Sequence, residues 1–301
     1  MNNENIYNSD EINLNDIFLA LWSKKFLIIF LTTIAAITSV FYSLSIPNIY
    51  TSSALLVSTD AEDSLGAKLG LSPLAGLAGL NSFQKSGGKA QEAIERMKSY
   101  DFFVDEFLPY IKFEDLVSAR SWTQSTNTII YNDDVTDPLA VKLSNQQAYE
   151  IYKGMLYISE DRKSLFMTMR IEHISPFIAQ QWLELIIRNI NNHMRDLDKI
   201  VAQNSIDFLN ISAQETQLSE IKGAIYKLIE NQIQVLTLAE ANKDYVFKPV
   251  SSPIVPERKS GPSRASICIS GTLFGFIISL FISLILHYRN SLIFKDIKSN
   301  A

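Results

Sequence analysis

The chain has 301 residues, of which 27 are Lys or Arg and 32 are Asp or Glu, giving a formal net charge of −5. Nucleic-acid binding needs a clustered excess of basic residues, and this sequence has no such cluster, so we expect no nucleic-acid partner. The single cysteine, Cys268, excludes an intramolecular disulfide. It lies in an apolar run with no His or acid nearby, which is typical of a small buried hydrophobe rather than a nucleophile.

Two uncharged apolar segments, residues 26–46 and 265–286, are the strongest signal in the sequence. Each is long enough for a helix of roughly 30 Å, the thickness of a bilayer core, and we predict two transmembrane helices. A cleaved signal peptide is the alternative for the first segment, but its apolar stretch is too long and too far from the N-terminus. A buried core helix is the alternative for the second, which is apolar all round rather than on one stripe.

The basic residues around the first segment predict the topology. Lys24 and Lys25 directly precede it, and no Lys or Arg follows until Lys68, so we expect a cytoplasmic N-terminus. Two spans return the C-terminus to the cytoplasm, leaving cytoplasmic tails at 1–25 and 287–301 that are too short to fold alone. Residues 47–264 then face the periplasm of a Gram-negative cell, with the chain anchored in the inner membrane.

The sequence of the exported region predicts an α/β (α+β) domain. We expect strands at 50–57, 128–131 and 165–171, where β-branched and aromatic residues gather, and helices at 90–107 and 146–156. The Gly- and Leu-rich segment 65–83 fits either a loop packed beneath this domain or an apolar patch for a neighbour, and we favour the loop.

A helical stretch from Pro176 to about Asn242 completes the exported region. Ser175-Pro176 is a typical helix start, and no later proline interrupts the stretch. One continuous helix over residues 176–242 would measure on the order of 100 Å, which is longer than a small domain can cover. We therefore predict a very long helical arm that projects or meets other chains.

Within this stretch, apolar residues recur at alternating steps of four and three, a coiled-coil-like seam in which a polar residue can fix the register. A second stripe, shifted in phase, follows it. The pattern fits packing against the chain's own fold and packing against a partner equally well. The seam consists of Ile190, Met194, Leu197, Val201, Asn204, Phe208 and Ile211, and the second stripe of Leu218, Ile221, Ile225 and Leu228.

Spaced prolines and a glycine pair lie at the entry to the second span. Prolines forbid a helix and stiffen an extended chain, so residues 249–262 predict a rigid connector from the domain to the membrane. Gly271 and Gly275 have the GxxxG spacing that lets another helix approach closely, although glycine is also common in membrane helices generally. The connector prolines are Pro249, Pro253, Pro256 and Pro262.

The sequence carries no recognisable catalytic constellation. It has no GxxxxGK[ST], GxSxG or HExxH motif. His173, His193 and His287 are too scattered for a metal site, and Asp133-Asp134 lies beside turn-forming residues. We therefore expect no catalytic, cofactor-binding or metal-binding residues, and no enzyme activity.

Both ends of the chain resemble the Wzz-type polysaccharide co-polymerases, the O-antigen chain-length determinants. The N-terminal likeness is EINLNDIFLALWSKKFLIIF, followed by the span and IPNIYTSSALLV. The C-terminal likeness is YVFKPVSSPIVPERKSGPSRA, which runs into a span carrying GTLFG, and it is the more specific of the two. Between them the resemblance is mainly one of architecture, with LAGLAGL as a local likeness.

The resemblance implies a membrane-proximal α/β domain with a long helical arm, assembled as a ring-like homo-oligomer. It implies control of how many repeat units a Wzy-type polymerase adds to an undecaprenyl-pyrophosphate-linked polysaccharide. It also implies the kinase-free branch of the family, and offers no catalytic residues. The alternatives are a two-span sensor, which the short C-terminal tail disfavours, a polysaccharide export adaptor, and a length regulator of capsule or enterobacterial common antigen.

Overall fold

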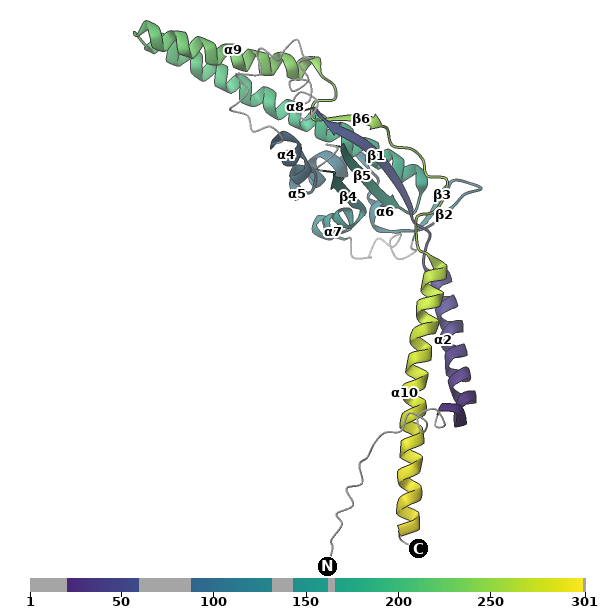
Figure 1. Cartoon of the computed structure of the whole chain (residues 1–301). Helices are drawn as coiled ribbons and strands as arrows, with labels where there is room; N and C mark the ends of the chain where they lie inside the picture. Colours follow the sequence, from purple (N-terminus) through teal and green to yellow (C-terminus); the bar gives the residue numbers. More distant parts are fainter. Residues whose placement is uncertain (1–20, 60–87, 132–142, 162–165, 300–301) are drawn as a thin grey trace, which may run out of the picture. The chain divides into compact units, whose positions relative to one another are not determined.

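The computed structural model describes residues 21–59, 88–131, 143–161 and 166–299 (Figure 1). It divides the chain into two units, residues 1–47 with 261–301, and residues 48–260, which we call the α/β domain. The predicted loop at 65–83 and the acidic pair Asp133-Asp134 lie outside the described residues. Each unit is described by itself below.

The first unit contains the helices α2 (Lys25–Ser45) and α10 (Arg264–Ser299). Lys25–Ser45 and Arg264–His287 are long and apolar enough to cross a membrane, as predicted. Most of their large apolar side chains are exposed, which a helix in the core of a water-soluble protein would not tolerate. The second span predicted at 265–286 agrees with Arg264–His287, and α10 itself continues beyond it to Ser299 through a segment without Gly or Pro.

A four-stranded antiparallel sheet forms the centre of the α/β domain, in the order β4-β5-β1-β6. Side chains on one face are buried, among them Ala54 and Leu56 of β1, which pair with Met169 and Met167 of β5. The strands are β1 (Tyr50–Ser58), β4 (Leu156–Glu160), β5 (Phe166–His173) and β6 (Phe247–Ser251). Two expected strands, at 50–57 and 165–171, are thus confirmed as β1 and β5.

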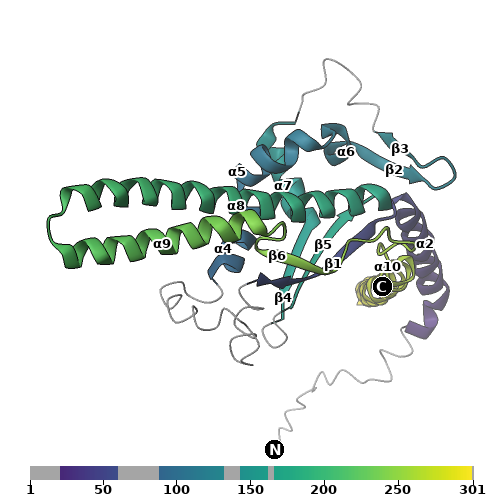
Figure 2. The ribbon, with the colours of Figure 1, turned by 90° about the horizontal axis from the view of Figure 1, so that it is seen from above.

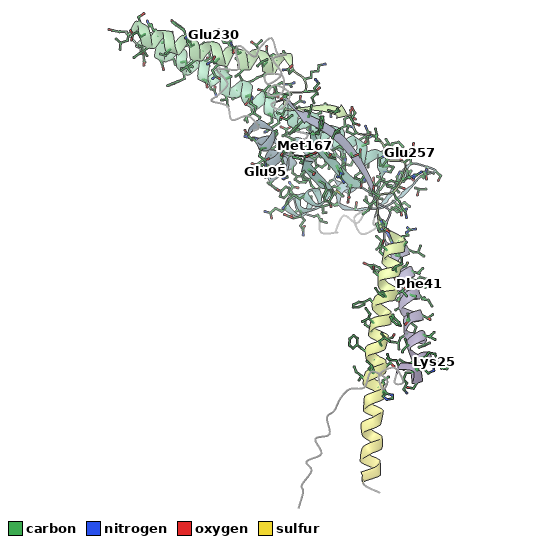
Figure 3. The ribbon with its side chains drawn as sticks, in the orientation of Figure 1. Lys25, Phe41, Glu95, Met167, Glu230 and Glu257 are labelled. Atoms are coloured by element: carbon green, nitrogen blue, oxygen red, sulfur yellow. The ribbon has the colours of Figure 1, made fainter. Side chains whose placement is uncertain are left out.

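The first half of α8 (Pro176–Glu215) covers the buried face of the sheet (Figure 2). Ser175 is its N-cap residue and Pro176 its first residue, as predicted. The helix contributes Leu183, Ile186 and Ile190, none of which is exposed, to a core shared with β1 and β5. Figure 3 shows Met167 in the body of this domain.

Short helices surround this core. The helix predicted at 90–107 is broken, because Ser99 accepts a hydrogen bond from the Phe102 amide (3.2 Å) and starts a new helix. Phe103 and Phe107 then pack their rings against Tyr152. The elements are α4 (Gly88–Met97), α5 (Tyr100–Phe102), η2 (Phe103–Phe107), η3 (Leu108–Tyr110), α6 (Phe113–Val117) and α7 (Asn145–Met155).

A separate two-stranded hairpin pairs β2 (Ala119–Thr123) with β3 (Thr128–Tyr131). Asn127, at φ 49°, lies in the turn and supplies the left-handed conformation that Asn tolerates. The hydroxyl of Tyr131 donates to Asp115 Oδ1 at 2.6 Å, which ties the hairpin to α6 and raises the pKa of Tyr131 to about 12. The expected strand at 128–131 is confirmed.

The long helical stretch is a hairpin rather than one helix. It breaks after Glu215, where Thr216 is extended (ψ 130°), and resumes as α9 (Ser219–Ala241). The two helices lie side by side in both Figures 1 and 2, and Figure 3 shows Glu230 on the returning helix. The expectation of a single helix over 176–242 is therefore corrected, whereas the long helical arm itself is confirmed. We call residues 200–241 the arm.

Candidate functional site: the arm and the connectors to the spans

The two helices of the arm are joined by a small apolar core of their own. Ala213 of α8 packs with Ile225 and Ile229 of α9, and Ile206 and Leu209 lie partly buried against them. The small side chain of Ala213 lets the two backbones approach closely. All of these residues belong to the arm. Their packing against α9 therefore stabilises the part of α8 that extends beyond the sheet.

The structure divides the predicted seam between three environments. Ile190 and Met194 are buried in the core of the α/β domain, and Leu197 is half-buried. The other members, Val201, Asn204, Phe208 and Ile211, are exposed. The helix–helix contact uses the neighbouring face of α8, which carries Ala202, Ile206, Leu209 and Ala213.

The arm therefore presents apolar side chains that the described residues of the chain leave exposed. Phe208 is 69 % exposed and Ile211 58 % exposed, one turn apart on α8. In the second predicted stripe only Ile225 is buried, and Leu218, Ile221 and Leu228 are exposed. A gathering of large exposed apolar residues on one element marks a surface suited to another protein or to lipid.

Polar contacts fix the base of the arm to the α/β domain. The Lys89 ammonium donates to Asp198 Oδ2 (2.7 Å) and the Tyr245 hydroxyl donates to the same oxygen (2.6 Å), linking α4, α8 and the segment before β6. Burial raises the pKa of Tyr245 to about 12, and its hydrogen bond to Asp198 adds to this effect. Burial is the largest single effect on Lys89 and lowers its pKa, but the hydrogen bonds and charge interactions with Asp198 and Tyr245 together outweigh it, so the pKa of Lys89 rises.

The proline-rich connector follows the outer edge of the sheet instead of standing free. Pro249 lies within β6, opposite Leu56 of β1, on an edge strand that can accept a residue without an amide proton. Further along, the Ser52 hydroxyl donates to the Ile254 carbonyl (2.9 Å). Pro253, Pro256 and Pro262 occupy the irregular stretch between β6 and α10.

The two chain segments that lead to the spans are held to each other. The Ser260 amide donates to the Ile49 carbonyl (2.8 Å), and the Thr51 amide donates to Ser260 Oγ (3.1 Å). The Lys259 ammonium also donates to Asn48 Oδ1 (3.3 Å). The α/β domain therefore begins and ends at a single hydrogen-bonded point.

The two predicted glycines lie where α10 meets α2. A Cβ at Gly271 would come within 2.4 Å of Ser39 Oγ, and one at Gly275 within 2.2 Å of Ala35 Cβ. Real atoms do not approach so closely, so each glycine leaves the space that the facing residue of α2 fills. The Ser39 hydroxyl also donates to the Ile267 carbonyl across this contact (3.0 Å).

Lys24 and Lys25 lie at the start of α2, Lys24 as its N-cap residue. The Lys25 ammonium lies 4.8 Å from the centre of the Trp22 ring, the arrangement of a cation–π contact. These positions agree with residues flanking a span, while the side of the membrane they face stays a prediction.

Two of the three histidines make local structural contacts. His173 is buried and accepts a hydrogen bond from the Ser175 amide at Nδ1 (2.9 Å), so Nε2–H donates to the Asp115 carbonyl (2.9 Å). Burial lowers its pKa, against the effect of these hydrogen bonds. His193 Nδ1 lies 3.0 Å from Glu106 Oε1. Among the described residues, no three His, Cys, Asp or Glu side chains gather as metal ligands would.

Comparison with known proteins identifies the N-terminal region. Residues 10–105 match the family model of Wzz, the chain length determinant protein. This region is of the Wzz type. The match spans α2, β1 and α4, and it confirms the resemblance that the N-terminal motif indicated. The C-terminal Wzz-like motif lies beyond the matched residues. No curated protein sequence matches the chain.

Two solved structures are similar to the chain at low identity. One is a full-length bacterial polysaccharide co-polymerase, with 15 % identity and a TM-score of 0.40, covering 93 % of this chain and 98 % of the other. The second is a fragment of WzzB, a polysaccharide co-polymerase from Salmonella Typhimurium, with 14 % identity and a TM-score of 0.32, covering 71 % and 100 %. At these scores neither contributes to the assignment, which rests on the Wzz match.

Proposed function

We propose that the chain is a non-enzymatic regulator of polysaccharide length, which controls the modal number of repeat units that a Wzy-type polymerase adds to lipid-linked O-antigen. The Wzz match over residues 10–105 carries this proposal. Two apolar helices of spanning length, flanking one large α/β domain, fit a protein anchored in the inner membrane with both termini in the cytoplasm. The growing chain in this proposal is linked to undecaprenyl pyrophosphate.

The mechanism we propose is scaffolding by a homo-oligomer. Phe208 and Ile211 face away from α9, so a neighbouring copy can cover the apolar surface of the arm without disturbing the hairpin. The two ends of the α/β domain, which lead to the spans, are joined by the hydrogen bond between Ser260 and Ile49. In the oligomer, such domains would hold the polymerase and the polymer in a fixed arrangement. No residue of the chain takes part in bond making in this account.

A deletion strain tests the proposal. Its lipopolysaccharide would be resolved on a gel that separates single repeat units, beside the same strain carrying the intact gene on a plasmid. We expect the cluster of long chains to collapse to a smooth decline on deletion and to return with the plasmid. An unchanged ladder in the deletion strain would refute O-antigen length control and direct the assay to capsule or enterobacterial common antigen. Loss of all surface polymer would favour an export adaptor.

A further inference from the structure

A cleft of about 620 Å³ lies on the α/β domain between α8, the β2–β3 hairpin and the segment that joins η3 to α6. Its volume is within the range of about 300–1,000 Å³ that is typical of small-molecule sites. It is separate from the exposed face of the arm, which uses residues beyond 200. Its accessible polar and aromatic lining includes Tyr110, Lys112, Asn127, Gln181, Glu184 and Arg188.

One wall is a row of polar side chains on α8. Gln181, Glu184 and Arg188 are exposed and spaced by three and four residues, so they lie on one face of the helix, one turn after another. The Gln180 amide donates to Glu184 Oε2 (3.0 Å), which holds this carboxylate in place. The row offers an amide, a carboxylate and a guanidinium, planar groups that donate or accept two parallel hydrogen bonds.

The opposite wall offers hydrogen-bond donors and an exposed aromatic ring. Tyr110 is 63 % exposed, and Lys112 beside it is exposed as well. Asn127 accepts a hydrogen bond from Trp122 Nε1 at its Oδ1 (2.9 Å), so its NH₂ group is left to donate. In the described part of the chain, neither Lys112 nor Arg188 forms an ion pair.

The floor of the cleft has little apolar area to offer. Trp182 is 4 % and Leu185 7 % exposed, so a Leu or Phe side chain of a partner peptide would find no deep apolar pocket. Asp115 is nearly buried and already accepts from Tyr131. The accessible groups are therefore mixed donors and acceptors around one exposed ring. That combination suits a ring-shaped ligand with hydroxyl groups along its edges and an apolar C–H face.

We propose that this cleft binds a short glycan segment, one to a few sugar rings of the polysaccharide whose length the chain regulates. The proposal rests on the proposed function for the identity of the glycan. Paired sugar hydroxyls would bond to Gln181, Glu184 and Arg188, and a sugar face would stack on Tyr110. A site for the polymer on the regulator itself would let the α/β domain sense or hold the chain as it grows.

Binding of defined oligosaccharides to the full chain in nanodiscs tests the site. The probe would be oligomers of one to three repeat units, made by partial acid hydrolysis of the surface polysaccharide of the source strain, with Kd measured by isothermal titration calorimetry. The double variant Gln181→Ala/Arg188→Ala removes two exposed wall residues. We expect it to raise Kd about tenfold or more, since each residue supplies hydrogen bonds worth up to a factor of ten.

A matched control is Gln214→Ala/Arg120→Ala, which removes the same residue types from exposed positions outside the cleft. The control should bind with the Kd of the unmodified chain, and both doubles should unfold at the same temperature. Equal Kd values for the two doubles would overturn the site, and so would an unmodified chain that binds no oligomer. Displacement of the oligomer by inorganic phosphate at millimolar concentration would likewise overturn it in favour of an anion site.

The oligosaccharide-binding test and the deletion test can give opposite results, and each combination has its own meaning. Length control without oligomer binding would remove the cleft proposal and leave the proposed function in place. Oligomer binding that the cleft variant abolishes, in a protein whose deletion leaves the O-antigen ladder unchanged, would keep the site and refute the O-antigen assignment.

Discussion

Asn191 on α8 binds Phe247 of β6 through both of that residue's backbone groups. Its Nδ2 donates to the Phe247 carbonyl (2.8 Å), and its Oδ1 accepts from the Phe247 amide (2.9 Å) and from the Val246 amide (2.8 Å). Asn191 is 2 % exposed, so water does not compete for these hydrogen bonds. One side chain therefore joins the helix that covers the sheet to the strand at the sheet's edge.

Replacing this residue should weaken the whole domain. Asn191→Ala leaves two buried amides and a carbonyl without partners, and we expect the free energy of unfolding to fall by about 2–4 kcal/mol. Urea denaturation of the full chain in nanodiscs would measure the change. Asn210→Ala, at an exposed position of the same helix, should stay within about 0.5 kcal/mol of the unmodified chain. A loss of similar size in both variants would contradict the role of Asn191.

His173 should make the domain sensitive to mild acid. Burial lowers its pKa below 6.5, so the folded state favours the neutral ring and the unfolded state takes up a proton first as pH falls. The stability from this residue is complete above about pH 6.5 and is lost as pH falls through the lower pKa of the folded state. Urea midpoints measured between pH 7.5 and 5 would show the decline.

The variant His173→Gln separates this effect from general acid denaturation. It removes the titrating ring, so we expect a lower midpoint at pH 7.5 and a shallower decline toward pH 5. His193→Gln leaves the His173 contacts intact and should retain the steep decline. Parallel pH curves for the unmodified chain and His173→Gln would show that another group is responsible.

A larger residue at Gly275 should disrupt the contact between α2 and α10. The position faces Ala35 with no room for a Cβ, so Gly275→Leu forces the helices apart, at a cost of about 1–3 kcal/mol. Unfolding by SDS in mixed micelles, followed by circular dichroism, would report the loss. Ser270→Leu, at an exposed position of α10, serves as the control and should unfold like the unmodified chain. Equal midpoints for the two variants would show that the glycine contact contributes nothing.

Charges on the outer face of the arm should reduce self-association. Phe208→Asp/Ile211→Asp places two carboxylates where we propose that a second copy packs, and within the described part of the chain both replaced side chains are exposed. Light scattering after size exclusion should show a smaller assembly with unchanged helix content. The double Asn210→Asp/Gln214→Asp adds the same charge at exposed polar positions and should leave the mass unaltered. An unchanged mass for the first double would place the interface elsewhere.

Patterns with strong local causes were predictable from the sequence. The spans follow from unbroken apolar runs, the start of α8 follows from Ser175-Pro176, and β1 follows from YTSSALLV. The family resemblance at the N-terminus came from residues around the first span, which the Wzz match includes. These features depend on short stretches of chain, so tertiary context does not override them.

The remaining features depend on contacts between distant segments. The break after Glu215 carries no Gly or Pro, and it forms because Ala213 packs back against Ile225 and Ile229. Pro249 was predicted to lie in a rigid connector, but it belongs to β6, because an edge strand tolerates a residue without an amide proton. The polar residues Asn191 and Asp198 of α8 fix the base of the arm, but most of their neighbours in sequence are polar too, and their partners lie some fifty residues away.

The place of β6 at the edge of the sheet also determines the order in which the chain can fold. β1 is made early in synthesis, but its second edge stays unpaired until β4, β5 and both helices of the arm have been made and Phe247–Ser251 appears. Pairing across so long a separation is slow, and an open strand edge is prone to pair with other chains. A nascent chain arrested within α9 should therefore be far more prone to aggregate than the completed protein.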